Sequence, residues 1–270
     1  MTKRYLNLGC GTRFCPDWEN VDFASTTPGV RAHNLLEGIP FPDTSFDLVY
    51  HSHILEHFPK KQALAFLREC HRVLMPGGVI RIAVPDLERI ARFYLEALER
   101  ALNEEPGWAE KYEWMVIEMY DQTVREFCGG EMLQFACNAT PTQLTFIKAR
   151  VGGELERMLS KSGDPVSWEA PSGRSSVRGK LLDYALRLLI GQKGLTDYDV
   201  GRFRSRGEVH KWMYDRYSLT KALKFAGFEE VEQVDANQSR VPNWTAFQLD
   251  TDPDGNIYKP DSLYMEATRR

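Results

Sequence analysis

The sequence lacks the features that mark membrane-spanning and secreted proteins. No apolar run in its 270 residues approaches the roughly 20 residues that cross a bilayer. Its mean hydropathy of -0.42 is that of an ordinary water-exposed protein. The opening segment, MTKRYLNLG, has no apolar signal region, so we expect a cytoplasmic protein. A net charge of -4 gives no global attraction to nucleic acid, which favours a small or medium-sized ligand.

The chain has few cysteines, and their number and spacing indicate neither a disulfide framework nor a thiolate zinc site. The chain has five cysteines, an odd number, and no two of them form a C-x-x-C pair. A disulfide framework and a thiolate zinc site are therefore both disfavoured. We expect reduced and mostly buried thiols at Cys10, Cys15, Cys70, Cys128 and Cys137.

Short β-rich runs alternate with amphipathic helical stretches in the first third of the chain. Such alternation predicts a largely parallel sheet in an α/β fold, with a ligand at the carboxyl ends of the strands. The predicted strands are 5–8, 18–22, 46–50 and 78–84, and 60–74 reads as a helix among them.

The strand pattern stops after Asp86, and the chain reads as helical until about residue 210. This stretch is too long for an ordinary connection between strands. We interpret it as a helical insertion that caps the sheet, with helices near 86–104, 107–127, 141–161 and 178–191 and a loose linker at 162–176.

The sheet pattern resumes near the end of the chain. Ser218 is the predicted N-cap of a helix, Gly227 is its predicted end, and a strand should follow. The tail reads as two strands around the turn DPDG. The predicted organisation is a core over 1–86, an insertion over 87–209 and the rest of the core over 210–270.

The stretch LNLGCGTRFCPDWENVDF sets a strand against two glycines and places an acid after a second apolar run. Gly9 and Gly11 let the backbone turn tightly and approach a ligand, and Asp22 can accept hydrogen bonds from ribose hydroxyls. A dinucleotide site would need a third glycine where Phe14 stands, and Pro16 breaks the loop that would form its helix. The pattern therefore favours a nucleoside ligand without a pyrophosphate.

Four motifs in order resemble the class I S-adenosylmethionine-dependent methyltransferases: LNLGCGT, the acid Asp22, IPFPDTSFDLVYHSHILEHF and ECHRVLMPGGVIRIAVPD. The resemblance is close over residues 4–86 and looser over 210–235. It implies a Rossmann-like, doubly wound sheet of seven mostly parallel strands with an antiparallel final strand.

The resemblance also implies a cofactor, S-adenosyl-L-methionine, and roles for individual residues. Gly9, Cys10 and Gly11 would line its methionine portion, and Asp22 would hold the ribose. The expected adenine contacts are Asn34 and Leu35, and His51 joins the cofactor-binding set because it should emerge at the same sheet edge.

Three histidines fall within YHSHILEHF, and their context narrows their roles. HILEH matches a zinc-peptidase pattern, but it follows a strand directly, where that pattern belongs inside a helix. Some class I methyltransferases hold a divalent ion through E-x-x-E-H, for which this chain offers His53, Glu56 and His57. Metal is not favoured here, because many relatives with LEH use none. If the acceptor is a hydroxyl, His53 and His210 are the candidate catalytic bases.

Two segments of the insertion are candidates for ligand contact. Asp121 and Arg125 lie four residues apart, so they form either a surface ion pair or part of an acceptor-binding site beside Gly129 and Gly130. The helix GKLLDYALRLLIGQK either packs against the insertion or makes peripheral contact with a membrane.

The leading hypothesis is a methyltransferase acting on a polar small or medium acceptor, with a hydroxyl of a sugar or natural-product intermediate favoured. A non-catalytic protein that binds an adenosyl ligand and recognises a partner is the alternative from another class. A nicotinamide-dependent oxidoreductase is disfavoured by Phe14. The sequence makes no prediction of oligomeric state.

Overall fold

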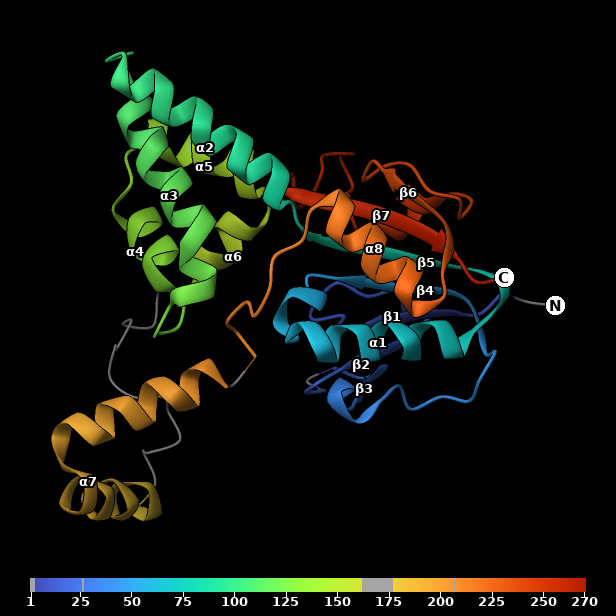
Figure 1. Cartoon of the computed structure of the whole chain (residues 1–270), viewed down its shortest axis with the longest axis horizontal. Helices are drawn as coiled ribbons and strands as arrows, with labels where there is room; N and C mark the ends of the chain where they lie inside the picture. Colours follow the sequence, from blue (N-terminus) through green and yellow to red (C-terminus); the bar gives the residue numbers. More distant parts are fainter. Residues whose placement is uncertain (1–2, 26, 162–176, 206) are drawn as a thin grey trace. The chain divides into compact units, whose positions relative to one another are not determined.

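The protein is described by a computed structural model for residues 3–25, 27–161, 177–205 and 207–270, so the predicted linker at 162–176 lies outside the described residues. The chain divides into two compact units (Figure 1). The sheet unit comprises residues 1–93, 149–153 and 211–270, and the helical unit comprises 94–148 and 154–210.

The sheet unit is built on seven strands in the order β3-β2-β1-β4-β5-β7-β6. Strands β1 to β5 run parallel to one another, and β7 pairs antiparallel with both β5 and β6. The predicted α/β sheet with its antiparallel final strand is therefore confirmed. The strands are β1 (Tyr5–Leu8), β2 (Glu19–Asp22), β3 (Val30–Ala32), β4 (Phe46–Ser52), β5 (Leu74–Pro85), β6 (Glu229–Val234) and β7 (Ser262–Thr268).

Two helices cover one face of the sheet, α1 (Lys60–Val73) and α8 (Arg216–Ala226) (Figure 1). Helix α1 buries a stripe at helical spacing that includes Ala63, Phe66 and Cys70, and the alternate residues of the strands meet it. The cap of α8 differs from the prediction. Asp215 is the N-cap and forms a capping box with Ser218, because the Asp215 carboxylate accepts from the Ser218 amide at 2.7 Å.

The opposite face of β4 and β5 is covered by an aromatic cluster from loops and a short 3-10 helix, η4 (Trp244–Phe247). Trp18 comes from the loop after β1, and its ring centroid lies 4.9 Å from that of Phe247. As predicted, residues 12–20 form no helix. The tail differs from the prediction: the DPDG turn joins an isolated bridge between Thr251 and Ile257, and β7 is its one full strand.

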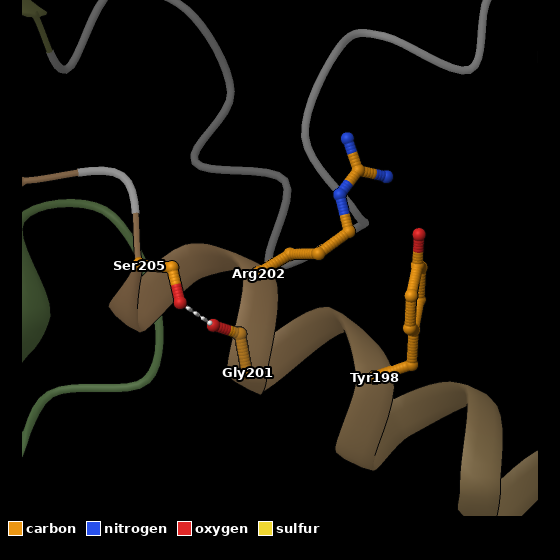
Figure 2. Close-up of a pocket in the computed structure, with 4 residues that line it drawn as sticks. All are labelled: Tyr198, Gly201, Arg202 and Ser205. Carbon is orange, nitrogen blue, oxygen red and sulfur yellow. Dashed lines mark hydrogen bonds between the residues drawn. The ribbon is translucent and has the colours of Figure 1, made fainter.

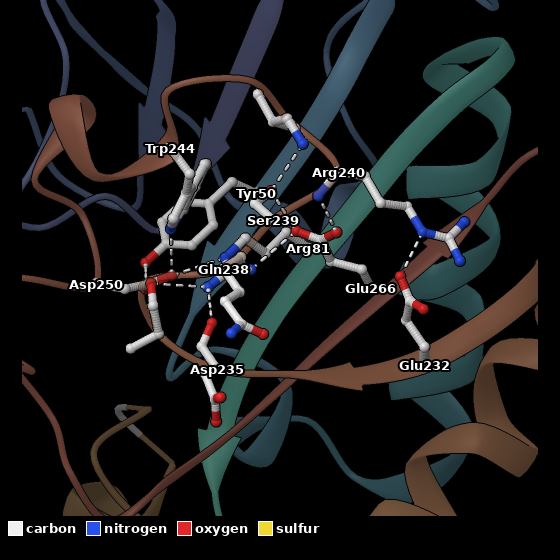
Figure 3. Close-up of polar contacts among 12 residues, drawn as sticks. Tyr50, Arg81, Glu232, Asp235, Gln238, Ser239, Arg240, Trp244, Asp250 and Glu266 are labelled. Carbon is white, nitrogen blue, oxygen red and sulfur yellow. Dashed lines mark hydrogen bonds and ion pairs between the residues drawn. The ribbon is translucent and has the colours of Figure 1, made fainter.

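Arg81 ties this second face together (Figure 3). Its side chain is fully buried in the middle of β5, 2.7 Å from Asp250 Oδ2 and 2.8 Å from Glu266 Oε1. The guanidinium also donates to three backbone carbonyls of residues 235–238. The two carboxylates hold the pKa of Arg81 above its ordinary value despite burial. Asp250 accepts in addition from Tyr50 and Trp244, so the charges are bonded on several sides.

The helical unit contains α3 (Trp108–Val124), α4 (Gly130–Asn138), α6 (Glu154–Lys161) and α7 (Val177–Arg204). Helices α2 (Leu87–Leu102) and α5 (Pro141–Val151) belong partly to each unit. The predicted helix over 141–161 is broken at Gly152 and Gly153, and α4 was not predicted. Among the described residues, none of the helices combines the length and apolarity needed to cross a membrane.

The glycine pair 152–153 is required by a close contact within the sheet unit. A Cβ on Gly152 would lie 2.2 Å from the Tyr258 carbonyl oxygen, and the Gly153 amide donates to that oxygen at 2.8 Å. The same Tyr258 ring lies 3.7 Å from the guanidinium carbon of Arg13, which follows the first glycine turn. Three separate segments of the chain thus meet at Tyr258.

Candidate functional site

The glycine turn is folded onto the end of β2. The amides of Gly9 and Cys10 both donate to the Val21 carbonyl, at 2.7 and 3.3 Å. Gly9 and Gly11 have φ of 63° and 53°, which favours glycine at both positions. A Cβ on Gly9 would lie 2.0 Å from Ile54 Cδ1, whereas a Cβ on Gly11 would meet no atom within 4 Å. Gly9 is therefore packed against Ile54, whereas the backbone at Gly11 is open, and a ligand role for Gly11 stays a prediction.

Asp22 completes this turn at the carboxyl end of β2. Its Oδ2 accepts from the Gly11 amide at 2.7 Å, which couples the predicted ribose acid directly to the predicted methionine-binding turn. The structure thus brings together Gly9, Cys10, Gly11 and Asp22. Burial, followed by the Asp22 charge, raises the pKa of Cys10 to about 11, so its thiol is neutral at pH 7. Cys10 therefore contributes backbone groups to the turn and no thiolate.

The predicted adenine contacts follow β3, next to Asp22. The Asp22 carbonyl accepts from the His33 amide at 2.8 Å, and Asn34 caps the short 3-10 helix η1 (Leu35–Glu37) through its Oδ1. Two apolar side chains beside these residues are unusually exposed: Phe23 at 77% and Leu36 at 61%. Phe23 was not among the predicted site residues, although a bulky apolar residue directly after a candidate ribose acid was the available signal.

His51 lies in β4 and is fully buried. Its ring packs edge-on against Phe66 of α1, with centroids 5.2 Å apart. Burial lowers the pKa of His51 to about 4, so the imidazole is neutral at pH 7, and its two ring nitrogens have no hydrogen-bond partner within the described part of the chain. The structure places His51 under α1, and its role toward the cofactor stays a prediction.

His53 ends β4 at the same edge as the glycine turn. It is a non-glycine residue with φ of 54°, held there by its amide, which donates to the Ala83 carbonyl at 2.8 Å. Its Nδ1 lies 3.3 Å from Glu56 Oε1, and its Nε2 lies 2.8 Å from Ser262 Oγ. Ser262 was not predicted at this site, because only the pairing of β7 with β5 brings residue 262 to this edge.

Glu56 and His57 lie in the 3-10 helix η2 (Leu55–His57), where the Glu56 side chain is fully buried. The Glu56 carbonyl accepts from the Lys211 and Trp212 amides, at 2.7 and 3.2 Å, so η2 anchors the chain where it re-enters the sheet unit. A metal role for His53, Glu56 and His57 stays a prediction.

The remaining predicted residues belong to the helical unit. His210 is buried, and its amide donates to the Gln122 carbonyl at 2.8 Å. Asp121 and Arg125 are paired as predicted, but the pair is not on the surface, because their side chains are only 3% and 8% exposed. Arg125 also lies 3.1 Å from Glu208 Oε1.

Asp121 is also bonded to the start of α4, where its Oδ1 accepts from the Glu131 amide at 2.7 Å. A Cβ on Gly130 would lie 2.3 Å from Asp121 Oδ1, so the backbone of Gly130 lies close against this carboxylate. The network joins α3 to α4, and acceptor contact by Asp121 and Arg125 stays a prediction.

Helix α7 carries a recess lined by Tyr198, Gly201, Arg202 and Ser205. Figure 2 shows these residues on successive turns, with the Ser205 hydroxyl donating to the Gly201 carbonyl at 2.8 Å. The same helix changes direction at Gly191, whose φ of 68° is not helical. The sequence allowed this apolar stretch to pack within the helical unit. Leu188 and Leu189 do not pack there, because their side chains are 70% and 80% exposed.

All five cysteines are free in the structure, and they are less buried than predicted. Cys10 and Cys70 are buried and Cys15 is half-buried, but Cys128 and Cys137 are exposed. Burial, followed by the Asp17 charge, raises the pKa of Cys15 to about 11. Neither Cys10 nor Cys15 therefore provides a thiolate near neutral pH.

Comparison with known proteins agrees with this geometry. Residues 19–82 match the family described as a methyltransferase domain. The protein named "Probable methyltransferase ltbC", of Aspergillus luteorubrus, is 44% identical over 48 residues, which are 17% of each chain. A "Probable S-adenosylmethionine-dependent methyltransferase" of Mycolicibacterium smegmatis is 40% identical over 57 residues, 21% of each chain. The matched part thus spans about a fifth of these curated relatives.

Among solved structures, a SAM-dependent methyltransferase from Thermotoga maritima is 13% identical with a TM-score of 0.40, covering 100% of this chain and 84% of that chain. The fold assignment itself rests on the strand order. That order and its antiparallel β7 are those of a Rossmann-like α/β sheet, and the match over residues 19–82 supports a class I S-adenosylmethionine-dependent methyltransferase. The match and the curated relatives support the predicted family, and with it S-adenosylmethionine as the cofactor.

Proposed function

We propose that this protein transfers a methyl group from S-adenosylmethionine to a hydroxyl of a polar small or medium acceptor. The observation that carries the proposal is the bond from the Gly11 amide to Asp22 Oδ2, 2.7 Å long, at the carboxyl ends of β1 and β2. It joins an open backbone turn to an acidic side chain, which suits a ligand with a charged amino-acid portion and a ribose.

The residues present fit the cofactor. A Cβ added to Gly11 would meet no atom within 4 Å, so there is space for the ligand next to this residue. Asp22 Oδ2 is oriented by the turn, and the carboxylate can accept from the ribose hydroxyls. The exposed Phe23 and Leu36 offer apolar surface beside Asn34 and Leu35, which suits the faces of a purine.

S-adenosylmethionine, when bound, supplies an electrophilic methyl group on a sulfonium. Its transfer is an in-line displacement, so the main task of the protein is to align an acceptor atom. A hydroxyl acceptor must also lose a proton, and His53 is the group best placed to take it, at the carboxyl end of β4 beside a buried carboxylate. We favour O-methylation because His53, next to a buried carboxylate, is placed to act as a general base. Sugar hydroxyls are the first acceptors to test.

The experiment is calorimetric titration of the full chain with S-adenosylmethionine and with S-adenosylhomocysteine. Asp22→Asn should weaken both affinities by about 10- to 100-fold, because a charge-assisted hydrogen bond contributes roughly 1.5–3 kcal/mol. Asp254→Asn, in the exposed DPDG turn, is the matched control and should bind as the wild type does.

Two results would count against the proposal. If the folded wild type binds neither compound, the cofactor assignment fails for this chain. If Asp22→Asn binds as tightly as the control, Asp22 is not the ribose acid. A competition titration with NAD tests the oxidoreductase hypothesis. Under the proposed function, NAD should not displace bound S-adenosylhomocysteine.

A further inference from the structure

Ser262, His53 and Glu56 form a continuous line of polar groups at the edge of the sheet. Ser262 begins β7 and pairs with Pro85, the last residue of β5, so it lies at the same edge as the end of β4. Its Oγ lies 2.8 Å from His53 Nε2, and His53 Nδ1 lies 3.3 Å from Glu56 Oε1. The exposed fraction is 15% for the His53 side chain and 7% for Ser262.

Glu56 determines which nitrogen of His53 carries the proton. The Glu56 carboxylate is fully buried, and a proton on the facing Nδ1 is attracted to it, whereas a lone pair there would be repelled. Other titratable groups also lie close to Glu56, among them His57, which offers a ring nitrogen within 4.8 Å of a Glu56 carboxylate oxygen. His51 and Tyr214 supply no competing cation. Burial keeps His51 neutral at pH 7, and burial, followed by the Glu56 charge, raises the pKa of Tyr214 to about 12.

With the proton on Nδ1, the lone pair of His53 is on Nε2 and faces Ser262. The Ser262 hydroxyl has two hydrogen-bond neighbours, His53 Nε2 and the Tyr264 hydroxyl, and with Nε2 unprotonated we assign Ser262 as the donor in the 2.8 Å contact. Its oxygen lone pairs are then available to a ligand. Tyr264 lies beside Ser262 and is also a neutral hydroxyl, since burial raises its pKa; it donates to the Lys259 carbonyl at 3.0 Å. Because Ser262 occupies Nε2, a ligand reaches the imidazole through this hydroxyl.

We infer that Ser262 is the group that receives the acceptor proton and relays it to His53 during methyl transfer, with Glu56 as the positioning residue that fixes the His53 tautomer. The inference rests on the proposed function. The acceptor oxygen forms a bond to the methyl carbon as the sulfur–methyl bond breaks. The acceptor proton moves to Ser262 Oγ, and the Ser262 proton moves to His53 Nε2. The positive charge leaves the sulfonium and ends on the imidazolium, opposite Glu56.

The first arm of the test needs no acceptor. Nitrogen NMR of the full chain with labelled histidine, at neutral pH, should show His53 protonated on Nδ1, with its signal assigned by its loss in His53→Gln. Ser262→Ala should leave the proton on Nδ1 but shift the Nε2 resonance, because Nε2 loses its hydrogen-bond donor. Ser262→Thr should retain the wild-type resonance. A wild-type His53 protonated on Nε2 would overturn the inference.

The second arm measures transfer of a radioactive methyl group to methyl glycosides and catechol as hydroxyl probes. Ser262→Ala should lower turnover by about 10- to 100-fold, toward the lower end of the usual contribution of a proton-transfer group, with unchanged affinity for S-adenosylhomocysteine. Ser262→Thr should restore most of the turnover, and Ser160→Ala, an exposed serine on α6, is the control.

The outcomes separate the two proposals. Wild-type binding of the cofactor without transfer to any hydroxyl probe counts against hydroxyl methylation and not against the tautomer of His53. Transfer that is undiminished in Ser262→Ala overturns the relay. If Ser262→Ala is unfolded by circular dichroism, Ser262→Cys, which keeps the size but is a weak donor, replaces it in both arms.

Discussion

At the scale of single residues, the two glycines of the first turn differ in what they contribute. Gly9→Ala should destabilise the fold by about 2–4 kcal/mol, because the positive φ and the contact with Ile54 are both unfavourable. Gly29→Ala is the matched control: its φ is 90° but no atom lies within 4 Å of the new Cβ, so about 1 kcal/mol is expected. Urea denaturation measures the difference, and equal losses would show that the Ile54 contact is accommodated.

Gly11→Ala separates stability from ligand approach. Its φ of 53° and open surroundings predict a loss of stability close to that of the Gly29 control, about 1 kcal/mol. The proposed function adds a second expectation, since a methyl group on this turn would stand where the cofactor approaches. Affinity for S-adenosylhomocysteine, measured by calorimetry, should fall by about 10-fold or more. Unchanged affinity would place the ligand away from Gly11.

His51 makes stability depend on pH. Burial lowers its folded-state pKa from 6.5 to about 4, so the unfolded chain binds the extra proton first as the pH falls. Stability should therefore drop by about 2 kcal/mol between pH 7 and pH 5 on account of this residue. His51→Leu, of similar size, should remove that part of the slope in urea denaturation. The half-buried His71, whose pKa is also lowered, contributes in the same direction and is unchanged in the variant. An identical slope in both proteins would contradict the assignment.

At the scale of elements, the loops that cover the second sheet face depend on one cation. Arg81→Met should cost about 3–5 kcal/mol, because it leaves Asp250 and Glu266 buried without their main counter-charge. Arg92→Met removes an exposed i,i+4 pair with Glu88 and should cost less than about 0.5 kcal/mol. Denaturant midpoints give the comparison. Similar losses in the two variants would mean that the buried network relaxes without Arg81.

At the scale of the whole molecule, the sheet unit is completed by the last strand of the chain. Strand β7 pairs with β5 on one side and β6 on the other, and it carries Glu266 to Arg81. A chain ending at residue 261 should therefore fail to fold, as judged by circular dichroism and gel filtration. A chain ending at residue 269 loses only the exposed Arg270 and its ion pair with Glu229, and it should fold normally. A folded shorter chain would show that the parallel strands are stable alone.

The sequence by itself determined the parallel sheet, its glycine turn and the acid of β2, because these depend on local features. Alternating strands and helices, a Gly-x-Gly turn and an acid after an apolar run are read within about twenty residues of one another. Helix α1 and its stripe, with Ala63, Phe66 and Cys70, were equally accessible.

Only the tertiary structure decided the features that join distant segments. Ser262 meets His53 because β7 runs antiparallel beside β5, and 209 residues separate the two side chains. The Asp121–Arg125 spacing is the same for a surface pair and a buried one, and only the structure shows that this pair is buried and bonded to Glu131 and Glu208. Pairing between strands far apart in the sequence depends on the whole packed chain, so no local pattern carries it.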